Sequence, residues 1–279
     1  HLRDLVALKL DQNRLRPEGA AALCAVLGTR MNNTLRELSL AENELGGENG
    51  HAAHSLATML RVNTSLRRLD LHGNHWLAAD AVIITEAIRP MDHLEDACCL
   101  DCVIMEAAHE LPVGALLRDD PSIASLRQPM GMSVQEAIVL GRTLAFSRAC
   151  QELEVEDTRL DLGSLRRDEC QAVHLADCQV EFWPAMVLGE VLLRGRERVE
   201  GAAEEAGALE ALRLQRNFLC GRERDVEAEV PQGLRSLGAG LSGPGFHPTL
   251  LDLSDNIIGP QRQQAEDHRL LRAELQRQA

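Results

Sequence analysis

Three segments near the start of the chain repeat one pattern of apolar and polar positions. Residues 5–13, 35–43 and 66–74 follow the template LxxLxLxxN, and the closing asparagines Asn13, Asn43 and Asn74 recur after 30 and 31 residues. The LxL centre alternates with a period of two, which is the period of a β-strand whose leucines point inward. The pattern therefore predicts short strands at equivalent places in successive structural repeats.

The template continues in six more degenerate copies, which gives about nine in all. In the fourth copy the alignment uses Leu94, Ala97, Cys99 and Cys102, so that a cysteine takes the asparagine position. Later copies begin at Ile123, Cys150, Cys170, Leu209 and Pro248. From about residue 123 the repeat lengths are irregular: residues 158 and 178 lie only 20 apart, whereas the next two steps are 39 each.

Helices are expected between the strands, because parallel strands need a crossover of a dozen or more residues, usually helical. Pro17 and Glu18 open one such helix, and the spacing predicts others near 48–61, 79–89, 105–118 and 133–147. The short step after Thr158 leaves room only for a turn containing Leu162 and Leu165. Two longer stretches, 182–205 and 233–248, are expected to loop out or to add a helix turn, and 260–278 to form a capping helix.

This pattern resembles the leucine-rich repeat family, and within it the ribonuclease-inhibitor-like class, which has a lead-in such as Asn32-Asn33-Thr34-Leu35. The class is found in the C-terminal regions of NOD-like receptors and in Ran GTPase-activating proteins. The resemblance implies an α/β fold: a right-handed solenoid (horseshoe) with a parallel sheet on the concave face and helices on the convex face. We expect one domain over 1–279, and, because the chain starts inside a repeat without Met, a fragment of a longer protein.

Charge and composition narrow the classes of partner. The chain has 43 acidic and 29 basic residues, a net charge of −14, which argues against general nucleic-acid binding. No apolar stretch is long enough to span a membrane and no signal-peptide pattern is present, so no membrane association is expected. Most of the eight cysteines take packing positions in the repeats. We therefore expect reduced thiols and a cytoplasmic protein.

Candidate chemistry is sparse. Cys98, Cys99 and Cys102, with His93 and His109 nearby, resemble a zinc knuckle, but a second CxxC pair is missing and the register gives the cysteines packing positions. The pairs His51/His54 and His72/His75 are expected on opposite sides of the coil. No phosphate loop, GxSxG or HExxH motif is present. The sequence predicts no metal, no cofactor and no enzymatic activity.

The outward positions of the strands are the predicted binding surface. In the sixth copy, four adjacent carboxylates would repel one another and raise each other's pKa values, and a basic partner would relieve this; the alternative is a solvated acidic face. A weaker candidate is the mixed cluster Arg213, Arg216, Asp252 and Asp255. The predicted partner-binding residues are Lys9, Glu37, Arg68, Asp70, His72, Arg127, Glu152, Glu154, Glu156, Asp157, His174, Arg213, Gln215 and Asp252.

Two functions are compatible with these features. The favoured one is a non-catalytic scaffold for protein–protein recognition, such as the sensor or regulatory region of a larger signalling protein. The alternative is a GTPase-activating protein of the Ran-directed type, which would orient a GTPase's own catalytic groups. Nothing in the sequence identifies the partner or the oligomeric state.

Overall fold

A computed structural model describes the chain over twelve stretches, which divide into two compact units. The first unit comprises residues 1–118 and 131–143, and the second comprises 119–130 and 144–279. The described stretches are 5–28, 34–47, 50–88, 100–106, 109–127, 131–155, 158–167, 169–176, 182–195, 209–217, 231–242 and 248–256.

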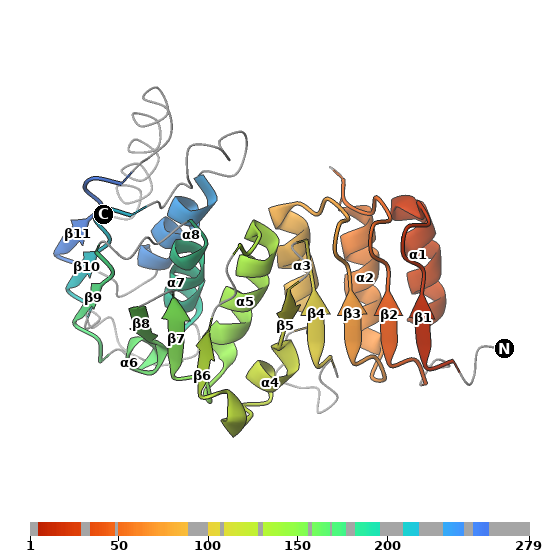
Figure 1. Cartoon of the computed structure of the whole chain (residues 1–279), viewed down its shortest axis with the longest axis horizontal. Coiled ribbons are helices and arrows are strands. Elements are labelled where there is room, and N and C mark those ends of the chain that lie inside the picture. Colours follow the sequence, from red (N-terminus) through yellow and green to blue (C-terminus); the bar gives the residue numbers. More distant parts are fainter. Residues whose placement is uncertain are drawn as a thin grey trace. The chain divides into compact units, whose positions relative to one another are not determined.

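Four parallel strands in sequence order form the sheet of the first unit (Figure 1). They are β1 (Ala7–Lys9), β2 (Glu37–Ser39), β3 (Arg68–Asp70) and β4 (Cys102–Ile104). Ala7 is opposite Glu37, and Glu37 is opposite Arg68, so the first three copies of the template align residue for residue. Their predicted adjacency is confirmed.

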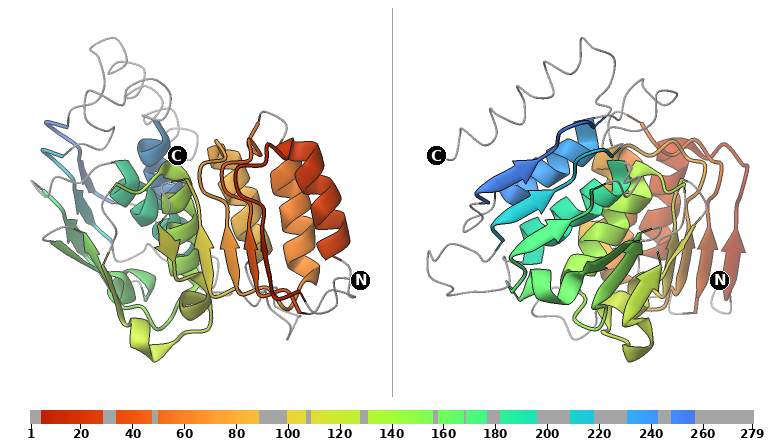
Figure 2. Two further views of the ribbon diagram at one scale, coloured as in Figure 1. Left: turned by 45° about the vertical axis from the view of Figure 1, so that its right-hand side comes forward. Right: turned by 60° about the vertical axis from the view of Figure 1, so that its left-hand side comes forward.

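Helices α1 (Arg16–Leu27), α2 (His51–Val62) and α3 (Ala78–Ile88) lie against one face of this sheet (Figure 2). The inward leucines Leu38 and Leu69 are fully buried between the layers, as are Leu56 and Ile84 of the helices. Burial of these aliphatic side chains supplies the main stabilisation of each coil. These helices and α5 (Val134–Phe146) match their predicted ranges to within a few residues.

The fourth copy is in a different register from the one predicted. Cys102 lies opposite Arg68, six residues later than the alignment required, and Leu100, Val103 and Met105 are the buried positions of this coil. The predicted helix over 105–118 is also wrong. The chain instead returns antiparallel as β5 (Glu110–Leu111) and then forms the short helix α4 (Val113–Leu117). Residues 91–99, with Cys98 and Cys99, lie outside the described stretches.

The second unit contains two three-stranded sheets. In one, β6 (Ser125–Arg127), preceded by the 3-10 turn η1 (Pro121–Ile123), pairs in parallel with β7 (Glu152–Val155), which pairs antiparallel with β8 (Thr158–Asp161). In the other, β9 (Ala172–His174), β10 (Ala211–Arg213) and β11 (Leu250–Asp252) are parallel. The expectation of one parallel sheet is therefore wrong for the described residues, and Thr158 begins a return strand.

The antiparallel return strands β5 and β8 belong to two copies of a similar unit, which the repeat template does not contain. Residues 111–120 (LPVGALLRDD) and 160–169 (LDLGSLRRDE) each complete a return strand and enter a five-residue helix, α4 or α6 (Leu162–Arg166). In both, a glycine amide donates to the backbone before the first strand: Gly114 to the Asp101 carbonyl and Gly163 to that of Gln151, each at 3.1 Å. The antiparallel strand then occupies one edge of β4 or β7.

The two stretches expected to loop out or to add a helix turn contain full helices, α7 (Phe182–Gly195) and α8 (Pro231–Leu241). Glycines allow their backbones to approach closely: a Cβ on Gly189 would lie 2.2 Å from the Ser236 carbonyl oxygen, and one on Gly240 would lie 2.4 Å from that of Gly189. The glycines are thus packing residues rather than loop markers. The capping helix expected over 260–278 lies outside the described residues.

Candidate recognition surface

The outward side of the first sheet brings most of its predicted binding residues together. We call this surface the first-sheet face; it carries Lys9, Glu37, Arg68, Asp70 and His72 on the side of β1–β3 that is opposite the helices. The strands place these side chains because alternate residues of a strand point to opposite faces. Parallel pairing then aligns equivalent positions of successive coils.

A row of ion pairs with alternating charges crosses the first-sheet face from Lys9 to Glu110. Lys9 Nζ lies 3.1 Å from Glu37 Oε1, and Arg68 reaches Glu37 at 3.9 Å and Glu110 at 2.6 Å. Hydrogen bonding to Arg68 lowers the pKa of Glu110 and correspondingly raises that of the guanidinium. Glu110 was not predicted, because only the antiparallel return of β5 along β4 brings it within reach of the Arg68 side chain.

Cys102 adjoins this row, with its thiol 3.8 Å from Arg68 Nη1. Burial raises the pKa of Cys102 to about 11, despite the nearby guanidinium. The thiol is therefore protonated at neutral pH and is a poor nucleophile or metal ligand. Cys102 is partly exposed on β4 opposite Arg68, so the predicted place at the asparagine position of the turn is wrong.

The turn level of the first-sheet face is acidic. His72 Nδ1 lies 2.8 Å from Asp70 Oδ1, and its Nε2 lies 3.8 Å from Glu42. Asp11 accepts hydrogen bonds from the Ser39 hydroxyl and from the Ala41 amide, the latter at 3.1 Å. Ser39 and Ala41 are buried in consequence, although the template placed them outward. Glu42, absent from the predicted set, lies three residues beyond the end of β2 and immediately before the template asparagine Asn43, which is the signal that could have identified it.

Beneath the turns, an asparagine ladder fixes the coils to one another. The Asn43 side chain accepts from the Asn13 amide at 2.9 Å, and that of Asn74 accepts from the Asn43 amide at 2.8 Å. Glu106 continues the ladder in the fourth coil, accepting from the Trp76 amide at 2.6 Å. Burial raises the pKa of Glu106, and the carboxylate of Glu136 acts in the same direction. Glu106 was not predicted, because the sequence alignment placed the strand of this coil six residues too early.

The N-terminus of α5 anchors the end of the first unit. Ser133 and Glu136 form a reciprocal capping box: the Ser133 hydroxyl accepts from the Glu136 amide at 3.2 Å, and the Glu136 carboxylate accepts from the Ser133 amide at 3.0 Å. Glu136 is fully buried and also receives the His109 amide and ring nitrogen, at 3.1 and 3.0 Å. His109, considered above as a possible zinc ligand, thus holds the loop before β5 against α5.

In the second unit, a cation faces the two described glutamates of the acidic cluster. Arg159, on the return strand β8, lies 3.3 Å from Glu154 and 3.9 Å from Glu152. One positive charge thus offsets part of their negative charge, because the antiparallel hairpin brings Arg159 across from them. Arg127 lies opposite Glu154 in the sheet register. Glu156 and Asp157 lie outside the described residues.

The sheet of β9–β11 aligns His174, Arg213 and Asp252 in one row, as the template implied. Arg213 Nη1 lies 3.3 Å from the His174 ring nitrogens. Asp252 accepts from the Ser254 hydroxyl and amide at 2.7 and 3.0 Å, and these bonds, with a smaller effect of Arg213, lower its pKa. Gln215 is half-buried beyond this row.

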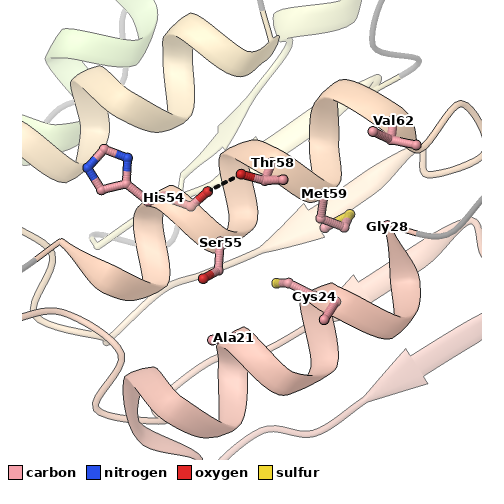
Figure 3. Close-up of a pocket in the computed structure, with 9 residues that line it drawn as sticks. Ala21, Cys24, Gly28, His54, Ser55, Thr58, Met59 and Val62 are labelled. Atoms are coloured by element: carbon pink, nitrogen blue, oxygen red, sulfur yellow. Dashed lines mark hydrogen bonds between the residues drawn. The ribbon is translucent and has the colours of Figure 1, made fainter.

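The main described cavities lie on the helix side, away from the predicted residues. Two grooves of about 290 and 390 Å³ run between α1 and α2 and share His54. Figure 3 shows Cys24 and Met59 between the two helices, where burial raises the pKa of Cys24 to about 12. Among the described residues, no three His, Cys, Asp or Glu side chains are grouped to hold a metal ion.

Two features of the described residues concern membrane-spanning helices and disulfide bonds. None of their helices is both long and apolar enough to cross a membrane. The described cysteines Cys24, Cys102, Cys150 and Cys170 are all free thiols. Of these four, Cys24 and Cys150 are buried, whereas Cys102 and Cys170 are partly exposed.

A family model described as Leucine Rich repeat matches residues 1–24 and 32–48. The match spans β1, α1 and β2, the same coils whose register agrees with the template. It supports assignment of these coils to a leucine-rich repeat family, and such repeats generally mediate protein–protein interaction.

Proposed function

We propose that this chain is a non-catalytic recognition scaffold that binds a partner protein through the outward faces of its strands. The observation that carries the proposal is the row Lys9–Glu37–Arg68–Glu110, whose cross-strand ion pairs hold long side chains in place before any partner arrives. Ordering such side chains on binding normally costs conformational entropy, so a preformed row lowers that cost.

The class of repeat, the shape of the solenoid and the side that binds are proposed from the sequence resemblance. We assign the chain to the ribonuclease-inhibitor-like class, in a right-handed, horseshoe-shaped solenoid with binding on the concave side. Crossover helices of 12, 12 and 11 residues support the class, since it has long repeats with a true helix. A sensor or regulatory region of a larger cytoplasmic signalling protein is the setting that we propose.

The partner's chemistry is inferred from the charges of the first-sheet face. Asp11, Glu42 and Asp70 make its turn level acidic, which favours a basic patch on the partner. The charge row below alternates in sign and favours a partner surface of mixed charge. A net charge of −14 disfavours nucleic acid as the target.

A matched pair of variants tests where the partner binds. Glu37→Ala with Arg68→Ala removes the centre of the charge row, and Glu18→Ala with Arg61→Ala removes one acid and one base from the exposed helix side. Both variants leave the net charge unchanged. Tagged chains would be used to capture partners with cross-linking and mass spectrometry. We expect proteins captured by the wild type and the helix-side variant to be lost from the row variant; loss from the helix-side variant alone contradicts the proposal.

A second measurement separates the scaffold from the Ran-directed alternative. We expect the full chain to leave the rate of GTP hydrolysis by Ran unchanged under single-turnover conditions. Acceleration that rises with the concentration of the chain would replace the proposal with the GTPase-activating one.

A further inference from the structure

The β4–β5 hairpin has a longer connection and a shorter ladder than the β7–β8 hairpin. Two residues separate Val155 from Thr158, and four residue pairs join β7 to β8. Five residues separate Ile104 from Glu110, and only two residue pairs join β4 to β5. A longer connection costs more entropy to close, and fewer cross-strand pairs offset that cost. The β4–β5 hairpin therefore depends more on contacts with other elements.

Glu136 of α5 provides such a contact. Its carboxylate is fully buried and accepts from the His109 amide at 3.1 Å, from the His109 ring nitrogen at 3.0 Å and from the Ser133 amide at 3.0 Å. Two of these three bonds come from the residue immediately before β5. Hydrogen bonds to a carboxylate are roughly twice as strong as those between neutral groups, and burial strengthens them further. Glu136 thus fixes the backbone where β5 begins.

Glu110, the first residue of β5, extends this placement to the first-sheet face. Its backbone is opposite Ile104, and its carboxylate lies 2.6 Å from Arg68 Nη2. The side chains of Arg68 and Glu110 are 35% and 64% exposed, and an ion pair with this exposure contributes little to stability. The ion pair is therefore a result of the position of β5 rather than its cause.

We propose that Glu136 and His109 are positioning residues for the charge row: through the backbone at the start of β5, they set the Glu110 carboxylate within reach of Arg68. The consequence for recognition rests on the proposed function, because the charge row carries that proposal. Glu136 is fully buried, so it acts on a partner only through Glu110. The capping box of α5 in this way determines which charge a partner meets at the end of the row.

The same capping box offers a matched pair of variants. Glu136→Ala removes the carboxylate that holds His109. Ser133→Ala removes the hydroxyl that accepts from the Glu136 amide at 3.2 Å and leaves that carboxylate in place. Both variants weaken the cap of α5, but only the first releases the start of β5.

The measurement is the pKa of the Glu110 carboxyl group, obtained by NMR titration of the full chain without a partner. Hydrogen bonding to Arg68 lowers this pKa in the wild type. Arg68→Ala gives the reference pKa in the absence of that bond. We expect the pKa of Glu110 to stay lowered in Ser133→Ala and to rise to the reference in Glu136→Ala.

His109→Ala removes the ring but not the amide, so it should give part of this rise, and it decides the question if Glu136→Ala does not fold. A pKa of Glu110 that stays lowered in the folded variants would overturn the proposal, because Leu111 and α4 would then suffice to hold β5. An equal rise in Ser133→Ala would also overturn it, since any weakening of α5 would have the same effect. No partner takes part, so this titration and the partner-capture experiment can fail independently.

Discussion

Replacing Asn74 with alanine tests the physical role of the asparagine ladder. Asn74 is fully buried; its side chain accepts from the Asn43 amide at 2.8 Å and donates to the Leu40 and Leu71 carbonyls at 2.9 Å. The Leu71 carbonyl also receives the Trp76 indole at 2.9 Å, so it keeps a partner in the variant. The substitution therefore leaves two buried backbone groups, the Asn43 amide and the Leu40 carbonyl, without their hydrogen bonds, and it also removes the longer bond of 3.4 Å from the buried Leu45 amide.

At about 1–3 kcal/mol for each of these two buried groups left without a partner, Asn74→Ala should lower the free energy of unfolding by about 2–6 kcal/mol. Asn13→Ala is the matched control. Its exposed side chain donates only to the Asp11 carbonyl, at 2.9 Å, and its loss should cost less than about 1 kcal/mol. Urea unfolding gives the global effect, and hydrogen exchange of the Asn43 amide gives the local one. Equal losses for the two variants, or unchanged protection of the Asn43 amide, would refute the reasoning.

Two further predictions concern a buried carboxylate and a close helix contact. Burial raises the folded-state pKa of Glu106, so the folded chain binds more protons at this group than the unfolded chain does. The contribution of Glu106 to stability therefore falls as pH rises from the ordinary glutamate pKa, about 4.3, through the raised pKa of the folded state. Urea midpoints measured between pH 3 and about 7 should show Glu106→Gln gaining on the wild type over that interval; parallel pH curves would contradict this. Gly189→Ala should lower the free energy of unfolding by about 1–3 kcal/mol, because the new methyl group would lie 2.2 Å from the Ser236 carbonyl oxygen. The cost of this close contact outweighs the better helix propensity of alanine. In thermal unfolding, Gly47→Ala should change little, since no atom lies within 4 Å of its added Cβ; equal shifts for the two glycines would count against the packing role.

Most of the prediction errors have one cause: a local pattern does not report which strand pairs with which. In the fourth copy, the pattern was satisfied by Ala97 and Cys99, but the strand that pairs with β3 is Cys102–Ile104, with Leu100, Val103 and Met105 buried. The prediction from the glycines was wrong for the same reason. The glycine-rich segment that starts at Gly233 resembles a loop, yet α8 covers its first part, and Gly240 lies in the tight contact with Gly189 of α7 that leaves no room for side chains.

The residues of the candidate surface differ in the same way: some could be placed from the repeat pattern and others could not. Glu37 and Arg68 could be placed on one face because their copies of the template are complete and equally spaced. Glu110 and Arg159 could not, since each reaches the surface through an antiparallel return strand that the repeat template does not contain. These two residues nevertheless complete the ion pairs with Arg68 and Glu154, and they alter the electrostatic character of the predicted surface.

The amino-acid sequence alone determined the coil: an inward LxL strand, a crossover helix and an asparagine turn, because period-two alternation and buried leucines leave little choice of local structure. Tertiary structure decided where the parallel sheet stops and which charges meet on its outward side. Both depend on hydrogen bonds between strand edges and on contacts across tens of residues, and the free energies of those pairings are not encoded in any single repeat.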